Sequence, residues 1–179
     1  MRMVSCVITS RAIQSLTRSN SRLKVRRPDQ GNFGIVRHHR SGPSAFQARG
    51  GKLILKGNGA DYQRSVLQEI DYYKSVVAKM GQDRVDQFVR FYVTPGVNHP
   101  GNGVMRDGKA VPAKVDLLGA LDGWVDSGKA PDTPVQVSQQ DQSPFKTIAS
   151  RPMCRYPLSP RFDGDGDPSQ AASFICAKQ

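Results

Sequence analysis

The sequence predicts an α/β fold in which parallel strands are flanked by helices. Residues 53–55 form a short apolar run bounded by glycines, as is typical of a buried strand in a parallel sheet. A helical pattern follows over residues 65–80, and residues 88–93 form a second, mostly apolar run before a Pro-Gly turn. A strand, a helix and a strand with short connections make a βαβ unit, whose strands are parallel and whose crossover is right-handed.

The helix of this unit carries start and stop signals as well as an apolar face. Ser65 and Gln68 have the spacing of a capping box, and Gly81 is placed to end the helix. Apolar residues fall on one face at positions i, i+4, i+7 and i+11, namely Val66, Ile70, Tyr73 and Val77. This pattern predicts an amphipathic helix.

A second helix is predicted after a long glycine-rich loop. Residues 116–127 carry apolar side chains at i, i+4 and i+7, namely Leu117, Leu121 and Trp124. Gly128 is placed as the residue that follows the helix end, and Pro131 blocks further extension. Beyond this helix, a turn-rich region is predicted as far as Gln179.

The net charge of +11 is concentrated at one end of the chain. Residues 1–52 hold 11 Lys and Arg side chains against the single acid Asp29, whereas the other residues hold 15 basic and 14 acidic side chains. Residues 1–43 also lack apolar periodicity, so we predict a disordered or unrelated basic segment over 1–43 and a folded part over 44–179. The basic segment lacks the interleaved aromatic residues of a nucleic-acid surface, so no nucleic-acid partner is predicted.

Neither a membrane partner nor a signal peptide is predicted. The sequence has no apolar run of the length, about 18 residues or more, that a membrane span requires. The apolar run at residues 3–8 is shorter than the core of a secretory signal, and Ser5 interrupts it.

Two of the three cysteines, Cys154 and Cys176, lie on either side of a loop rich in Pro and Gly. A covalent tie would help such a segment, because it is short of apolar core. The residues alone leave two alternatives open, a disulfide or two unrelated thiols. A disulfide would imply an oxidising compartment.

Two polar residues follow the predicted strands, where functional groups of doubly wound sheets are found. Asp61 comes shortly after the first strand, and His99 lies in the loop after the second. In α/β-hydrolases the triad follows the chain order nucleophile, acid, histidine, and Asp61 before His99 reproduces the last two positions. The carboxylate of a triad fixes the imidazole tautomer and stabilises the imidazolium. A turn or capping role for Asp61 and a solvated His99 are the alternatives.

Four segments resemble, in order and spacing, the tannase and feruloyl esterase family. GGKLILKGNGADYQRSVLQEIDYY is similar to the family's strand, Gly-x-Ala-Asp turn and helix with Ile-Asp-Tyr-Tyr, and RFYVTPGVNHPGNG resembles its strand leading into a Pro-Gly-x-x-His loop. VDLLGALDGWVDSGKAPD resembles the family's late helix, and RPMCRYPLSPRFDGDGDPSQAASFIC its closing segment. The resemblance covers residues 44–177.

The resemblance implies a C-terminal portion of a serine esterase that cleaves aromatic acid esters on a partial α/β-hydrolase sheet. By position it makes Asp61 the triad acid and His99 the triad base, and it makes Cys154 and Cys176 a disulfide. It also implies a secreted or periplasmic location. No cofactor is expected in this chain, since the calcium of the family lies in an upstream lid domain.

The chain departs from the family pattern in two ways. Pro100 stands where many members have a cysteine bonded to one beside the serine, and neither a Gly-x-Ser-x-Gly nor a Cys-Ser-x-Gly elbow occurs. We therefore expect a fragment whose triad serine is missing. The alternatives are a catalytically inactive, truncated remnant without a substrate, and a basic binding protein that acts through residues 1–43.

Overall fold

The computed structural model describes residues 43–178. The predicted basic segment, residues 1–43, lies outside the described residues except for Pro43, and its separation from the folded part stays a prediction. The described elements are, in order, α2 (Pro43–Ala48), β1 (Leu53–Asn58), α3 (Val66–Met80), α4 (Gln82–Asp86), β2 (Val89–Thr94), α5 (Leu117–Ser127), β3 (Val135–Gln139), β4 (Thr147–Pro152), β5 (Leu158–Phe162), the 3₁₀ turn η1 (Ala171–Ser173) and β6 (Phe174–Lys178).

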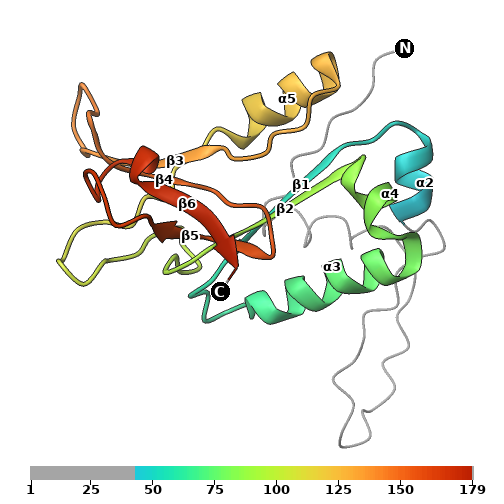
Figure 1. Cartoon of the computed structure of the whole chain (residues 1–179), viewed down its shortest axis with the longest axis horizontal. Coiled ribbons are helices and arrows are strands. Elements are labelled where there is room, and N and C mark those ends of the chain that lie inside the picture. Colours follow the sequence, from blue (N-terminus) through green and yellow to red (C-terminus); the bar gives the residue numbers. More distant parts are fainter. Residues whose placement is uncertain (1–42, 179) are drawn as a thin grey trace, which may run out of the picture.

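The predicted strand–helix–strand unit with parallel strands is present. β1 pairs with β2 in parallel, with Leu53 opposite Val89 and Asn58 opposite Thr94. The chain passes from β1 to β2 through α3 and α4 (Figure 1). Both strands end later than predicted, and their carboxyl ends, Asn58 and Thr94, lie side by side.

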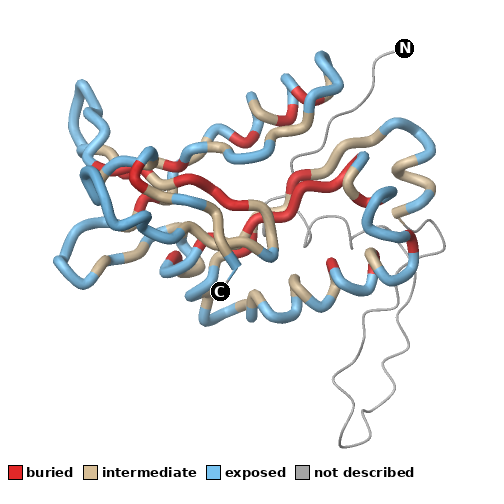
Figure 2. The backbone as a smooth tube through the Cα atoms, in the orientation of Figure 1, coloured by how far each residue is buried: buried red, intermediate tan, exposed pale blue. Residues whose placement is uncertain are grey.

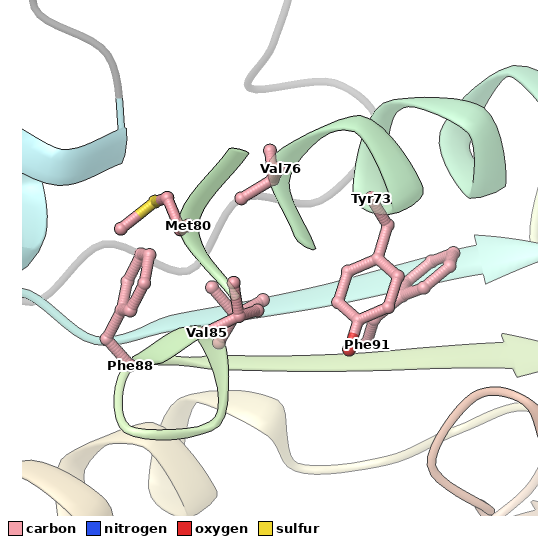
Figure 3. Packing of buried hydrophobic residues seen from close by; sticks show 7 residues of the cluster. Tyr73, Val76, Met80, Val85, Phe88 and Phe91 are labelled. Atoms are coloured by element: carbon pink, nitrogen blue, oxygen red, sulfur yellow. The ribbon is translucent and has the colours of Figure 1, made fainter. Parts of the chain in front are cut away.

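Helices cover both faces of this strand pair, with α3 on one side and α5 on the other (Figure 1). The cluster on the α3 side, shown in Figure 3, contains Tyr73, Val76, Met80, Val85, Phe88, Val89 and Phe91. The cluster on the α5 side contains Ile54, Tyr92, Leu117, Leu121, Trp124 and Met153. Successive side chains of a strand point to opposite faces, so β1 and β2 contribute to both clusters. The strand pair therefore forms the buried centre of this region (Figure 2).

The predicted start and end of α3 are confirmed, and its buried face is shifted. Ser65 Oγ accepts a hydrogen bond of 3.3 Å from Leu67 N, and Gly81, at a φ of 83°, donates its N–H to Val77 O. The most buried side chains of the helix are Tyr73, Val76 and Met80, whereas Val66, Ile70 and Val77 are half-buried. The buried face of α3 is therefore rotated from the predicted one. Its buried residues near the end of the helix pack against Val85 of α4 and Phe88.

The prediction of α5 is confirmed. Asp116 caps the helix by accepting a hydrogen bond of 2.8 Å from Gly119 N. Gly128 is left-handed, with a φ of 71°, and donates its N–H to Trp124 O. The apolar face is buried as predicted, at Leu117, Leu121 and Trp124.

The prediction of a turn-rich region after α5 is incomplete, because two hairpins also lie there. β3 pairs with β4 and β5 pairs with β6, both antiparallel. Their inward positions carry polar residues, such as Gln136 and Ser138 in β3, and β5 contains Pro160. In β3 the alternating apolar residues, Val135 and Val137, are less buried than the polar residues between them, which is the reverse of the usual strand signal. Within residues 43–178, every helix is too short or too polar to span a bilayer.

Candidate active site

Asp61 lies in a tight turn directly after β1. Asp61 N donates to Asn58 O over 3.2 Å, which closes the turn, and Gly59 N donates to Thr94 O over 2.8 Å, which ties the turn to the end of β2. The turn is short because α3 begins a few residues later. The carboxylate is therefore held at the carboxyl end of the strand pair.

His99 lies in the loop after β2, which turns back sharply. Asn98 N donates to Asn102 O over 2.7 Å, and Asn98 Oδ1 accepts from Asn102 N over 2.9 Å. Gly96 has a φ of 72°, and a Cβ on Gly103 would lie 2.1 Å from Gly96 O. Both glycines are needed, one for a left-handed backbone and the other for close approach of the two limbs of the loop.

The structure brings the two predicted residues together. Asp61 Oδ2 lies 2.9 Å from His99 Nδ1. Asp61 Oδ1 accepts hydrogen bonds from the backbone N–H groups of Gln63 at 2.8 Å and Arg64 at 3.0 Å. The Asp61 side chain is 5% exposed and the His99 side chain 33% exposed. Because a carboxylate only accepts, His99 Nδ1 carries the proton, and Nε2 is left as the acceptor nitrogen.

The hydrogen bonds of Asp61 favour its ionised form. Burial raises the pKa of Asp61, but the hydrogen bonds from His99, Arg64 and Gln63 outweigh it, so the pKa lies below its usual value of 3.8. Asp61 therefore stays a carboxylate beside the imidazole at neutral pH. Among the described residues, none hydrogen-bonds His99 Nε2. That nitrogen is available to take a proton from a group that approaches it.

A family model described as tannase and feruloyl esterase matches residues 36–177. The chain belongs to this family. An uncharacterised esterase of Agrobacterium fabrum is 43% identical over 135 residues, which cover 75% of this chain and 23% of that protein. The mono(2-hydroxyethyl) terephthalate hydrolase of Piscinibacter sakaiensis is 37% identical over 137 residues, covering 75% of this chain and 21% of that protein. The chain thus spans about a quarter of the length of these relatives.

Solved structures of tannase and feruloyl esterase proteins have a similar fold. Feruloyl esterase B from Aspergillus oryzae superposes with a TM-score of 0.62 at 26% identity, covering 75% of this chain and 28% of that chain. Tannin acyl hydrolase from Aspergillus niger superposes with a TM-score of 0.58 at 20% identity, covering 76% of this chain and 24% of that chain, which shows the fold alone.

The disulfide expected from the resemblance to this family is confirmed. Cys154 and Cys176 are bonded, with their Cα atoms 5.5 Å apart. The bond joins the segment after β4 to β6, and Cys154 is fully buried. Between residues 43 and 178, no group of three or more His, Cys, Asp or Glu side chains is placed to hold a metal ion.

Sequence reasoning missed a group of charges beside the Asp61 turn. Burial lowers the pKa of Lys56 on β1, and nearby Glu69 on α3 opposes this shift. Burial raises the pKa of Glu69, which Arg64 and Lys56 oppose and Asp61 reinforces. Arg64 Nη2 lies 3.7 Å from Glu69 Oε1. The signal that could have found this group was Lys56, a charged residue directly after the apolar run of β1.

Proposed function

We propose that this chain supplies the acid and the base of a Ser-Asp-His triad in an esterase that hydrolyses aromatic acid esters. One observation carries the proposal: His99 Nδ1 and Asp61 Oδ2 lie 2.9 Å apart, beyond the carboxyl ends of two adjacent parallel strands. This is the arrangement in which a carboxylate fixes an imidazole tautomer and stabilises its protonated form. Family membership supports the ester as the bond that is cleaved.

In the proposed reaction, His99 moves one proton in each half. His99 Nε2 takes the proton of a serine hydroxyl while the serine oxygen bonds to the ester carbonyl carbon. The tetrahedral intermediate then collapses, the bond to the alcohol oxygen breaks, and His99 Nε2 returns the proton to that oxygen. Water repeats the sequence on the acyl-enzyme and releases the acid. Asp61 keeps its negative charge throughout and compensates the imidazolium.

We propose that the serine is none of the serines in these 179 residues. The sequence contains neither form of nucleophile elbow, and Ser65 Oγ serves as the N-cap of α3. The matched relatives are between four and five times as long as the matched segment, so their length accommodates a nucleophile, an oxyanion hole and a substrate pocket. On this view β1 and β2 are two strands of a larger α/β-hydrolase sheet. We expect the chain by itself to be inactive.

The substrate class and the compartment are also proposals. Relatives and structural neighbours are named as feruloyl esterase, tannin acyl hydrolase and mono(2-hydroxyethyl) terephthalate hydrolase, and ferulate and terephthalate are aromatic acids. The disulfide supports folding in an oxidising compartment, as in a secreted or periplasmic protein. The proposed hydrolysis requires no cofactor from this chain.

The first test measures the purified chain with methyl ferulate and methyl gallate, beside its His99→Ala variant. We expect no enzymatic turnover of either ester by either protein, because a base without a nucleophile cannot form an acyl-enzyme. Turnover that His99→Ala abolishes would show that this chain carries its own nucleophile, and would overturn the part of the proposal that places the serine elsewhere.

The second test places the site in a complete enzyme. Residues 44–178 replace the matched segment of the Piscinibacter sakaiensis hydrolase, and hydrolysis of mono(2-hydroxyethyl) terephthalate is measured. We expect turnover that falls by roughly three or more powers of ten in Asp61→Asn and His99→Ala. A folded, active chimera that keeps its rate in His99→Ala would refute the assignment of the base.

A further inference from the structure

Asn58, the last residue of β1, contacts both turns that form the site. Its backbone carbonyl accepts the hydrogen bond from Asp61 N over 3.2 Å. Its side-chain Nδ2 donates to the carbonyl oxygen of Asn98 over 2.9 Å. Asn98 directly precedes His99, so one residue joins the turn of the carboxylate to the turn of the imidazole.

The side chain of Asn58 is held in one orientation. Lys56 Nζ donates to Asn58 Oδ1 over 2.8 Å. Because a lysine ammonium has only donors, the amide oxygen faces Lys56 and the amide NH₂ group faces the Asn98 carbonyl. A reversed amide would lose both hydrogen bonds. The strand thus presents a fixed donor to the loop of His99.

We infer that Asn58 is a positioning residue that holds the turn of His99 against the turn of Asp61, and so sets the contact between imidazole and carboxylate. The inference rests on the proposed function, since this contact matters for hydrolysis only if the pair serves a triad. Displacement of a reacting group by about 1 Å can cost on the order of a hundredfold in rate. A restraint at this point therefore affects chemistry as well as stability.

Besides the contact between Asp61 and His99 itself and the bond from Gly59 N to Thr94 O at the end of β2, the described residues show two hydrogen bonds between the turns, and the Asn58 side chain makes one of them. The other is a backbone bond of 2.9 Å from Ala60 N to Val97 O, which the substitutions at Asn58 leave in place. The remaining bonds of Asn98, to Gly101 and Asn102, lie within its own turn and shape it without joining it to β1. Loss of the Asn58 bond should therefore loosen the pair rather than abolish it.

The test uses the full chain and the tautomer of His99. Long-range ¹H–¹⁵N NMR correlations of the imidazole give the ratio of the Nδ1–H to the Nε2–H form while the ring is neutral. The chain has three histidines, and His99→Ala identifies the signal. The variants are Asn58→Ala, which removes the donor, and Asn58→Asp, which places an acceptor against the Asn98 carbonyl. Asn102→Asp is the matched control, because it adds the same charge at an exposed position of the same loop.

We expect the Nδ1–H form to predominate in the wild type and in Asn102→Asp. The ratio should fall on the order of fivefold in Asn58→Ala, the change that the loss of one ordinary hydrogen bond allows, and further in Asn58→Asp. Lys56→Met removes the bond that fixes the Asn58 amide and should lower the tautomer ratio by less than Asn58→Ala does. If neither Asn58 variant folds, an unchanged ratio in folded Lys56→Met would overturn the inference. A folded variant of Asn58 that loses stability to urea but keeps the wild-type ratio would mean a purely structural role and would overturn the inference.

The chimera separates this inference from the proposed function. Asn58→Ala in the active chimera should lower kcat with little change in KM, since the substrate-binding part of the enzyme is unaltered. If the NMR ratio falls as expected but no chimera hydrolyses an ester, the proposed function fails and the positioning role stands. If the chimera is active and Asn58→Ala changes neither kcat nor the tautomer ratio, the positioning role fails and the proposed function stands.

Discussion

The two halves of the described chain are stabilised by different means. The unit of β1, α3 and β2 is held by apolar side chains buried on both faces of the strand pair. In the hairpins of β3 to β6, several buried side chains are polar, including Gln136, Ser138 and Ser150, and large apolar residues such as Ile148 and Ile175 are exposed. The hairpins instead rely on specific links, among them the disulfide and a hydrogen bond of 2.8 Å from Ala171 N to Ser150 Oγ.

The difference explains where the site lies. Asp61 and His99 follow strands that are fixed by a packed core, and packed cores resist the small displacements that a triad does not tolerate. The contact of the hairpins with this core includes Tyr156, which lies between β4 and β5. Its ring centroid is 5.4 Å from that of Phe91, and its N–H donates to Phe91 O at the edge of β2 that does not pair with β1. We therefore expect substitutions in the core around β1 and β2 to displace Asp61 and His99, and substitutions in the hairpins to displace them less.

The largest effect should come from Phe91→Ala. Phe91 is 1% exposed and packs between the rings of Tyr73 and Tyr156. Its removal leaves a cavity and should cost about 3–5 kcal/mol of unfolding free energy, measured by urea denaturation. Ile148→Ala in β4, at a side chain 46% exposed, is the control and should change it by less than about 1 kcal/mol. Equal costs at the two positions would contradict the contrast between the halves.

Removal of the disulfide should come next and should act on the other half. Cys154→Ala with Cys176→Ala should cost about 3 kcal/mol, since the bond closes a loop across a sequence separation of 22 residues. Hydrogen exchange should speed up in β5 and β6 far more than in β1 and β2. If β1 and β2 lost their protection to the same extent, the two halves would unfold as one unit and the comparison would fail.

A smaller loss of stability is expected from a substitution in the loop of His99, outside the packed core. Gly103→Ala places a Cβ 2.1 Å from Gly96 O and should cost about 1–3 kcal/mol while displacing the loop of His99. Gly123→Ala at an exposed position of α5 is the control, because its Cβ would meet nothing within 4 Å, and alanine there should stabilise by about 0.5–1 kcal/mol. The His99 tautomer ratio should change in the first variant only.

The parts of the fold that were predictable share one physical property. α3 and α5 bury apolar side chains at helical spacing, and β1 and β2 contain continuous apolar runs, so these patterns are visible in the sequence. α2 and α4 have six and five residues, too few to show a helical period. The hairpins bury polar side chains and place Pro160 in a strand, so their burial does not follow the apolar pattern from which strands are predicted.

The site was predictable to the same extent. Asp61 and His99 could be paired because the carboxyl ends of adjacent parallel strands meet at one edge, whatever the details of the loops. The role of Asn58 could not be found, since its partner Asn98 lies 40 residues away and an asparagine at a strand end is ordinarily a turn residue. Their contact exists only once β1 and β2 are in register.

The smallest effect separates the charge of Asp61 from its geometry. Because the native pKa of Asp61 is lowered, the unfolded state takes up its proton first on acidification. The contribution of this carboxylate is therefore fully present above the unfolded pKa of about 3.9 and is lost as the pH falls through the lower native pKa. Asp61→Asn cannot titrate at this position, so the part of its deficit in unfolding free energy that comes from the charge of Asp61 should shrink as the pH falls below about 4. Other acids with lowered pKa values, such as Asp107 and Asp167, are present in both proteins and cancel in the difference. A deficit that stayed constant down to pH 2.5 would mean that Asp61 acts through shape alone, and that the hydrogen bonds from His99, Arg64 and Gln63 do not favour its ionised form.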